Sequence, residues 1–175
     1  MKYTSLIFIV SAPSGTGKTT LINALLQEDQ KIENAITHTT RHKRDNEVND
    51  IHYHFISKAE FNQLKLKNFF IETTEIYNEH YGTSKIAVVD ILQNNRDVIL
   101  NIEWNGARSI RKLFKERVIS IFVMPPSLEK LRARMLNRGD VEHTITNRLK
   151  TVEEELLYMQ EYDYCIINDD FVQAY

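Results

Sequence analysis

Runs of apolar residues that predict buried strands alternate along most of the chain with apolar residues at helical spacing. The strand-like runs lie at residues 6–10, 98–103, 118–124 and 164–167. The helical patterns, with apolar residues three or four positions apart, occupy about 17–27, 85–94, 107–114, 128–135 and 145–159. Strands that alternate with helices require crossover connections, which produce a parallel sheet covered on both faces. The pattern therefore predicts an α/β fold around a parallel central sheet.

The same spacing predicts which helical side chains face the core. Ser84 and Ser127 are expected to cap the helices that follow them, because a serine hydroxyl accepts a hydrogen bond from a free backbone N–H of the first turn. The side chains expected to point inward are Ile86, Val89 and Leu92 after Ser84, and Ala107, Ile110, Leu113 and Phe114 in the next helix.

Residues 35–83 have a different character from the segments around them. Strands are favoured at 35–40, 51–56 and 69–76, with a strongly polar loop at 41–50. The sequence Ser57-x-x-Glu60 is a capping box, which predicts a short helix. A small, mostly β lobe is therefore predicted between two elements of the main sheet.

The loop after the first strand has the chemistry of a phosphate-binding P-loop. The pattern G-x-x-x-x-G-K-[ST] is matched from Ala12 to Thr19, with Ala12 in place of the first glycine. Such a loop turns backbone N–H groups toward an anion, and the helix N-terminus adds positive potential. Lys18 can reach the β- and γ-phosphates, and the Thr19 hydroxyl can ligate Mg²⁺. The alternative, a glycine-rich turn without a ligand, is disfavoured because Lys18 and Thr19 stand at the correct offset. The triphosphate site is predicted at Ala12, Pro13, Ser14, Gly15, Thr16, Gly17, Lys18, Thr19 and Thr20.

Composition restricts the class of protein. The 175 residues suffice for one domain, and a net charge of −2 provides no basic surface for nucleic acid. The first five residues lead directly into the P-loop strand, which argues against a signal peptide, and no apolar run is long enough to span a membrane. The single cysteine, Cys165, is expected to be a buried structural thiol in a reducing compartment. We therefore expect a cytoplasmic protein without nucleic-acid or membrane partners.

Short motifs spread over nearly the whole chain occur in an order typical of one family. They are Ser11-Ala12-Pro13-Ser14-Gly15-Thr16-Gly17-Lys18; Thr39-Thr40-Arg41-His42-Lys43-Arg44 with Glu47-Val48 and Tyr53; Phe70-Ile71-Glu72; Tyr81-Gly82-Thr83-Ser84; Ile102-Glu103-Trp104-Asn105-Gly106; Pro125-Pro126-Ser127; Arg138-Gly139; Arg148-Leu149; and Ile167-Asn168-Asp169-Asp170. In these motifs the chain resembles the guanylate kinases, which transfer a phosphoryl group from ATP to GMP.

The resemblance implies a three-layer P-loop fold in a single domain, residues 1–175. Its parts would be a core at 1–34, 84–126 and 160–175, a GMP-binding lobe at about 35–83 and a helical lid at about 127–159. It further implies ATP and GMP as partners, dGMP as a second acceptor, Mg²⁺ as cofactor, and a monomer or homodimer. Asn168 would lie near the ATP adenine.

The polar loop of the lobe carries groups suited to a phosphate. Arg41 and Arg44 can each direct a planar guanidinium toward phosphate oxygens, and Tyr53 and Tyr81 can each donate an O–H. By resemblance these four side chains hold the GMP phosphate. The alternative is a solvated basic turn with two tyrosines that pack on the sheet.

Guanine is expected to be recognised by Glu72. Guanine presents two adjacent donors, N1–H and the 2-amino group, and a carboxylate can accept both. By resemblance the hydroxyls of Thr37 and Thr83 lie near the base, and Glu103 belongs to the same GMP site. Asn101 and Glu103 stand where members of the family usually carry aspartates.

A third group of arginines is expected on the lid. Phosphoryl transfer spreads negative charge over the transferred group, which positioned cations stabilise. Resemblance assigns this role to Arg134, Arg138 and Arg148, whereas Arg132 is expected to be surface charge. The catalytic set is therefore Lys18, Arg41, Arg138 and Arg148, and no general base is needed because the acceptor is already a phosphate oxyanion.

Two other functions remain open from the sequence. One is a guanylate-kinase-like module that binds a protein and lacks catalysis, although such modules typically lack the intact Lys18 and Thr19 found here. The other is a P-loop kinase with a different phosphorylated acceptor, which Glu72 disfavours.

Overall fold

The computed structural model describes residues 5–45 and 47–175. Its centre is a five-stranded parallel sheet in the order β2 (Ile32–Asn34), β7 (Asp97–Asn101), β1 (Ile7–Ser11), β8 (Val118–Met124) and β9 (Tyr164–Ile167). The α/β class and the parallel sheet predicted from the sequence are confirmed. The first four residues of the predicted core and Asn46 of the predicted polar loop lie outside the described residues.

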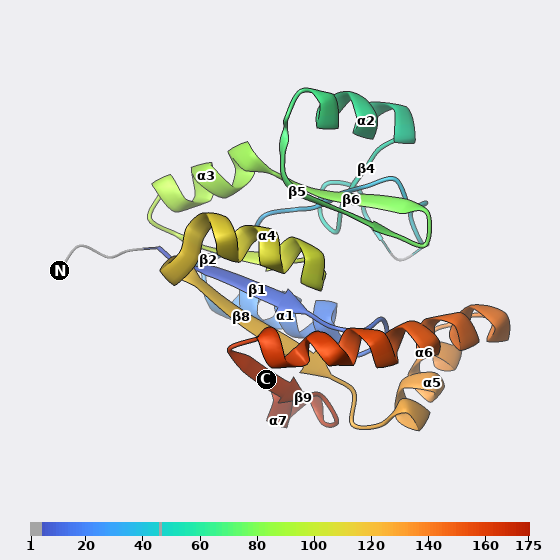
Figure 1. The fold of residues 1–175 in the computed structure, drawn as a ribbon. Coiled ribbons are helices and arrows are strands. Elements are labelled where there is room, and N and C mark those ends of the chain that lie inside the picture. Colours follow the sequence, from blue (N-terminus) through green and yellow to red (C-terminus); the bar gives the residue numbers. More distant parts are fainter. Residues whose placement is uncertain (1–4, 46) are drawn as a thin grey trace.

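Two layers of helices cover the two faces of this sheet (Figure 1). Because side chains alternate along a strand, Ile7 and Ile9 face the layer of α3 (Lys85–Gln93) and α4 (Trp104–Phe114). Val10 faces α1 (Lys18–Glu28), where it packs with Ile22. The carboxyl ends of β1 and β7 therefore meet at the edge where the P-loop begins.

The lobe at 35–83 is a second sheet that stands beside the first. Its strands lie in the order β4 (His54–Phe55), β3 (His38–Thr39), β6 (Glu79–Ser84) and β5 (Phe70–Ile76), and α2 (Lys58–Leu66) covers one side. The predicted capping box at Ser57 and Glu60 is present. Tyr77 and Asn78, both with positive φ, form the tight turn between β5 and β6.

The segment predicted as a lid is a pair of helices, α5 (Leu128–Asn137) and α6 (Glu142–Leu157). Ser127 caps α5 as expected, through a hydrogen bond from the backbone N–H of Lys130. The two helices pack through Leu131, Met135, Ile145 and Val152, a cluster of its own. Short 3₁₀ turns at Lys115–Arg117 and Tyr158–Glu161 and a terminal helix α7 (Phe171–Ala174) complete the fold.

Several local expectations were wrong. Ile86, Val89 and Leu113 are 61%, 40% and 59% exposed, whereas they were predicted to face the core. Helix α3 is apolar almost all round and buries Val88 and Ile91 instead, so its pattern does not define one face. Leu113 lies beside, not on, the stripe formed by Ala107, Ile110 and Phe114.

Cys165 is exposed, and the predicted buried thiol is wrong. The reason is its place on β9, an edge strand of the sheet, which pairs with β8 alone. The predicted strand at 51–56 shortens to His54–Phe55, and the strands β2 and β6 were not predicted. No helix within 5–45 and 47–175 has both the length and the apolar character needed to cross a membrane.

Candidate active site

The P-loop links the end of β1 to the start of α1. Gly17 has a φ of 90°, a left-handed conformation that favours glycine. A Cβ at this position would lie 2.5 Å from Nδ2 of Asn168, so the close approach of Asn168 also requires glycine. Asn168 Nδ2 donates to the Thr16 carbonyl at 2.6 Å. The predicted adenine-site residue is thus bound directly to the P-loop.

Arg134 supports the same loop from α5. Its Nη1 donates to the carbonyl oxygens of Asn168, at 2.8 Å, and Thr16, at 3.4 Å, and its Nη2 donates to the carbonyl of Asp169 at 3.0 Å. This arginine was predicted to act with the lid arginines. In the structure it joins the P-loop to the segment after β9.

Lys18 and Thr19 open helix α1 at the edge of the sheet. The Lys18 ammonium lies 3.6 Å from Oε1 of Glu103, the residue that precedes α4. The Thr19 side chain is exposed, so its hydroxyl is accessible to a cation that a bound triphosphate would bring. A phosphate-binding loop, an ammonium and a free hydroxyl are the donor set that a magnesium nucleotide requires.

Glu72 lies at the opposite side of the site, on β5. A β-bulge between Phe70 and Glu72 shifts the register, so that Glu72 pairs with Thr83 of β6. Thr83 Oγ1 donates to Glu72 Oε1 at 2.6 Å. Gly106 of α4 allows the carboxylate to fit, because a Cβ there would lie 2.7 Å from Oε2.

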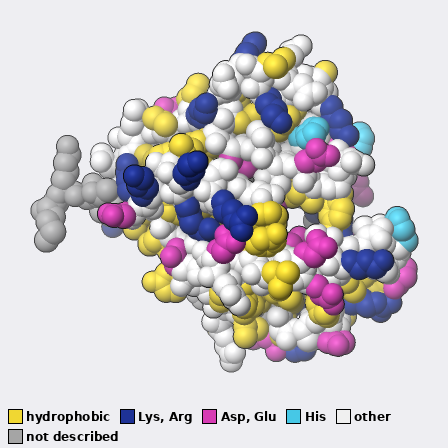
Figure 2. Space-filling model, viewed as in Figure 1, with side chains coloured by type: hydrophobic (Ala, Val, Ile, Leu, Met, Phe, Trp, Pro, Cys, Tyr) yellow, Lys and Arg dark blue, Asp and Glu magenta, His cyan; other side chains and the backbone are white. Residues whose placement is uncertain are grey.

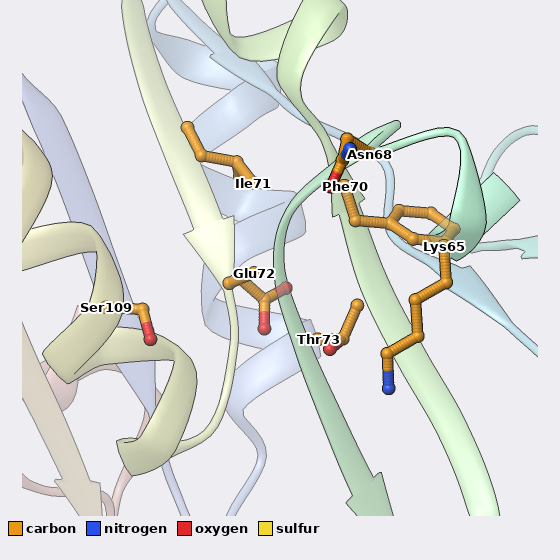
Figure 3. A pocket seen from close by; sticks show the side chains of 7 residues that line it. All are labelled: Lys65, Asn68, Phe70, Ile71, Glu72, Thr73 and Ser109. Carbon is orange, nitrogen blue, oxygen red and sulfur yellow. The ribbon is translucent and has the colours of Figure 1, made fainter.

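Burial changes the chemistry of Glu72. The side chain is 5% exposed, and desolvation raises its pKa to about 7 although the hydroxyl of Thr83 stabilises the ionised form. A cavity of about 300 Å³ adjoins Glu72 and is lined by Lys65, Thr73 and Ser109 among others (Figure 3), so of the residues predicted to bind GMP it contacts Glu72 alone. A buried carboxylate can accept paired N–H donors from a planar base.

Arg41 and Arg44, here called the lobe arginine pair, are both held by Glu47. The Arg41 guanidinium donates to the two Glu47 oxygens at 2.7 and 2.9 Å, and the backbone N–H of Arg44 donates to Oε2 at 2.8 Å. Burial alone would raise the pKa of Glu47, but these hydrogen bonds outweigh it and lower the pKa.

Tyr53 and Tyr81 stand next to this pair, with ring centroids 6.2 Å apart. The Arg41 guanidinium lies 5.3 Å from the centre of the Tyr53 ring.

Arg138 and Arg148, here called the lid arginine pair, share Asp140 in the same way. Arg138 donates to Asp140 Oδ2, and Arg148 Nη1 donates to the same oxygen at 2.6 Å. Arg138 also approaches the Ser14 hydroxyl of the P-loop at 3.4 Å. Burial would raise the pKa of Asp140, but the two arginines hold it below its usual value.

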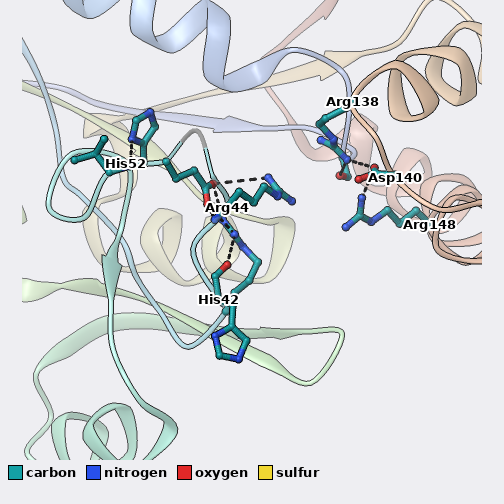
Figure 4. A network of polar contacts seen from close by, with 10 residues as sticks. His42, Arg44, His52, Arg138, Asp140 and Arg148 are labelled. Atoms are coloured by element: carbon teal, nitrogen blue, oxygen red, sulfur yellow. Dashed lines mark hydrogen bonds and ion pairs between the residues drawn. The ribbon is translucent and has the colours of Figure 1, made fainter.

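The two arginine pairs face each other across the site (Figure 4). Burial lowers the pKa of Arg44, and the positive charges of Arg41, Arg138 and Arg148 lower it further. In the space-filling view the surface is notched between the lobe and the α5–α6 pair (Figure 2). Guanidinium groups from separate parts of the chain therefore converge on one space in front of the P-loop.

The structure thus gathers the predicted residues on the sides of one site. Thr37 is buried in the lobe next to β3, and Thr20 is exposed in the first turn of α1. Arg132 pairs with Glu142 at the surface, as expected. The sequence prediction assigned no role to Glu47 and Asp140, the carboxyl groups that pair with the arginines. The strongly charged segment 137–143 was a signal for Asp140, and the motif that contains Glu47 was a signal for that residue.

Comparisons with known proteins agree with this geometry. The family model described as guanylate kinase matches residues 4–175. The chain is 42% identical over 166 residues to the guanylate kinase of Alkalilimnicola ehrlichii, which covers 94% of this chain and 81% of the relative. It is 46% identical over 169 residues to that of Chromohalobacter salexigens, covering 96% and 78%. The crystal structure of guanylate kinase from Anaplasma phagocytophilum superposes with a TM-score of 0.82 at 31% identity, covering 99% of this chain and 81% of that one. The chain therefore belongs to the guanylate kinase family.

Proposed function

We propose that this protein transfers the γ-phosphoryl group of ATP to GMP, giving ADP and GDP, and that dGMP is a second acceptor. The observation that carries the proposal is the convergence of the lobe and lid arginine pairs in front of the P-loop. Guanidinium groups that face one another across one space favour binding of a further anion between them, because each can still donate N–H groups to oxygens. An acceptor phosphate opposite a triphosphate is such an anion.

The donor nucleotide occupies the P-loop in this proposal. Backbone N–H groups of residues 12–17 surround its phosphates, Lys18 contacts the β- and γ-phosphates, and Asn168 lies near the adenine. Thr19 would hold Mg²⁺ through its hydroxyl, and the ion would supply neutralisation of the phosphate charge. The accessible Thr19 hydroxyl supports this assignment.

The acceptor phosphate lies against the lobe. Arg41 and Arg44 bind its oxygens together with the hydroxyls of Tyr53 and Tyr81. Glu47 already holds the Arg41 guanidinium in place, so little side-chain entropy is lost when the phosphate binds. The acceptor oxygen is an anion, so no group has to remove a proton from it. The lid arginine pair then stabilises the charge on the transferred group.

Guanine is selected by Glu72 together with Thr83, Thr37 and Glu103. A site that pairs buried polar groups rejects a base that lacks the matching donors by about 10⁴-fold. Adenine has neither N1–H nor the 2-amino group. AMP should therefore be a far poorer acceptor than GMP.

A coupled assay for ADP tests the reaction, with ATP and each of GMP, dGMP, AMP, CMP and UMP. GMP and dGMP should support turnover, and the other nucleotides should not. The absence of ADP formation with GMP would contradict the proposal. It would favour the alternative of a non-catalytic guanylate-kinase-like module that binds another protein. Turnover only with another acceptor would identify a different kinase.

The variant Glu72→Gln tests base recognition. We expect kcat/KM for GMP to fall by about 10²-fold, because an amide cannot accept two N–H donors. With wild type, kcat/KM should also fall as the pH drops below about 7, since protonation of Glu72 removes an acceptor. The phosphate of GMP itself titrates near pH 6. Both proteins share this titration, so the ratio of their kcat/KM values as a function of pH reports the protonation of Glu72 alone. A near-normal kcat/KM in the variant would overturn the role of Glu72.

The predicted cytoplasmic location and the monomer or homodimer state remain predictions. Size-exclusion chromatography with light scattering would decide the oligomeric state.

A further inference from the structure

The end of α6 is attached to α4 by a stack of two aromatic rings. Tyr158, the first residue after α6, lies on Trp104, the first residue of α4, with ring centroids 3.8 Å apart and ring planes 10° apart. The Arg108 guanidinium covers both rings, 4.8 Å from the centre of the Trp104 ring and 5.1 Å from that of Tyr158. These three side chains are here called the aromatic stack. Its geometry combines ring stacking with two cation–π contacts.

A carboxylate fixes the guanidinium of the aromatic stack. Arg108 Nε donates to Glu161 Oε2 at 2.8 Å, and Arg108 Nη2 donates to Oε1 of the same residue. Glu161 ends the 3₁₀ turn that begins at Tyr158, and Nη1 of Arg111 in α4 lies 3.8 Å from its Oε2. The bidentate pair therefore ties the turn after α6 to α4 a second time.

Packing places the aromatic stack at the boundary between the α5–α6 pair and the main core. Ile145 and Val152 of α6 belong to the small cluster that this helix forms with α5. Leu156 packs against both that cluster and the core of the main sheet, and Met159 packs against the main core. Helix α6 therefore extends from α5 to the main sheet (Figure 1), and its last turn is the part held by the core and the aromatic stack.

Arg148 lies beyond this boundary on the same continuous helix. It precedes Tyr158 by ten positions. At a rise of about 1.5 Å per residue, this separation is about 15 Å along the helix axis. A tilt of about 4° at Tyr158 would therefore displace Arg148 by about 1 Å. A misplacement of about 1 Å can lower the rate of a reaction by about 10²-fold.

We propose that Tyr158 is a positioning residue, which through the aromatic stack fixes the direction of α6 and so aims the Arg148 guanidinium at the transferred phosphoryl group. This inference rests on the proposed function, which gives Arg148 its role. Helix α5 has an attachment of its own, since Arg134 binds the P-loop and the segment after β9. The aromatic stack supplies the corresponding attachment for α6.

Steady-state kinetics of the full chain, with ATP saturating and GMP varied, tests this inference. Tyr158→Ala should lower kcat by about tenfold and leave KM for GMP unchanged, because a tilted helix misplaces a group that acts in the transition state. Tyr158→Phe retains the ring and should restore the wild-type kcat. Leu157→Ala changes the neighbouring exposed residue and is the matched control, for which wild-type constants are expected.

A double variant separates positioning from a general loss of structure. In Arg148→Ala the guanidinium that the aromatic stack aims is already absent, so the addition of Tyr158→Ala should lower kcat by less than about twofold further. If Tyr158→Ala caused the same loss in that background as in wild type, Tyr158 would act independently of Arg148 and the inference would be wrong.

The fluorescence of Trp104 is a readout that does not depend on activity, because this residue is the single tryptophan of the chain. In Tyr158→Ala its emission should shift to longer wavelength, since the indole loses the ring that covers it. An emission spectrum identical to that of wild type would contradict the stack itself.

A second variant keeps the test decisive if Tyr158→Ala does not fold. Arg108→Ala changes an exposed side chain and removes both cation–π contacts and the pair with Glu161. It should lower kcat by about threefold with KM for GMP unchanged, and a wild-type kcat would count against the inference.

The same assays separate this inference from the proposed function. A wild-type chain that forms no ADP from ATP and GMP would contradict both. Normal turnover in wild type, together with an unchanged kcat in Tyr158→Ala, would overturn the role of Tyr158 alone.

Discussion

The lobe and lid arginine pairs are built alike but held in place differently. Each consists of two arginines and one carboxylate, Glu47 in the lobe and Asp140 in the lid. Glu47 lies within six residues of Arg41 and also accepts the backbone N–H of Arg44, so local hydrogen bonds fix the lobe pair. Arg138 ends α5 whereas Arg148 lies within α6, so their geometry depends on how the two helices pack.

This difference indicates a division of labour. The lobe pair belongs to a loop in which both arginines bind Glu47, which suits a group that binds the acceptor before reaction. The lid pair is carried by two helices with their own small core, so it can move toward the P-loop as one unit. We therefore expect the lobe pair to act mainly on acceptor binding and the lid pair mainly on the transition state.

The largest effect should come from removal of one arginine on each side. Arg148→Ala should lower kcat by about 10³-fold with little change in KM for GMP, because it removes charge stabilisation that develops during transfer. Arg41→Ala should instead raise KM for GMP by about 10²-fold, since it removes a guanidinium that we propose binds the acceptor phosphate. Steady-state kinetics with GMP varied would measure both.

Arg132→Ala is the matched control for the lid, because Arg132 pairs with Glu142 at the surface. It should leave both constants unchanged. If Arg148→Ala changed KM for GMP and left kcat intact, the proposed division between lobe and lid would be wrong.

A smaller effect is expected when the carboxylates are removed. Glu47→Gln should raise KM for GMP by about tenfold, and Asp140→Asn should lower kcat by about tenfold. A hydrogen bond to a charged group contributes roughly 1.5–3 kcal/mol, and its loss leaves the arginines less well oriented. Glu75→Gln, which removes an exposed charge from the same lobe, is the control. If both variants had wild-type kinetics, the arginines would not need the carboxylates of Glu47 and Asp140 to orient them.

The smallest effect concerns the contact between the lobe and helix α6. The Tyr77 phenol and the Thr151 hydroxyl are 3.2 Å apart and join the β5–β6 hairpin to α6. Tyr77→Phe keeps the ring but removes this exposed hydrogen bond, so stability should change by less than about 1 kcal/mol. Turnover should rise slightly if opening of the lid limits the rate. Thermal unfolding and kcat would be compared with those of Thr151→Val, which should match; opposite effects would contradict a shared contact.

Sequence and structure agree best where local chemistry decides. The P-loop, the capping box at Ser57 and the serine caps of α3 and α5 were all predicted, since each depends on residues within a few positions. The exposure of Ile86 and Cys165 was not predicted, because it depends on which elements lie next to α3 and β9. An apolar residue on an apolar helix or on an edge strand carries no local signal of its surroundings.

The sequence by itself determined the fold class and the phosphate-binding loop, which rest on periodicity and on the chemistry of a short motif. Its resemblance to the guanylate kinases selected the arginines that we propose for phosphoryl transfer. Only the tertiary structure decided which carboxyl group stands beside each cation: Glu47 with the lobe pair, Asp140 with the lid pair, and Glu103 with Lys18. Charge interactions depend on distance in space, and distance in space is set by how the lobe, the core and the α5–α6 pair pack together.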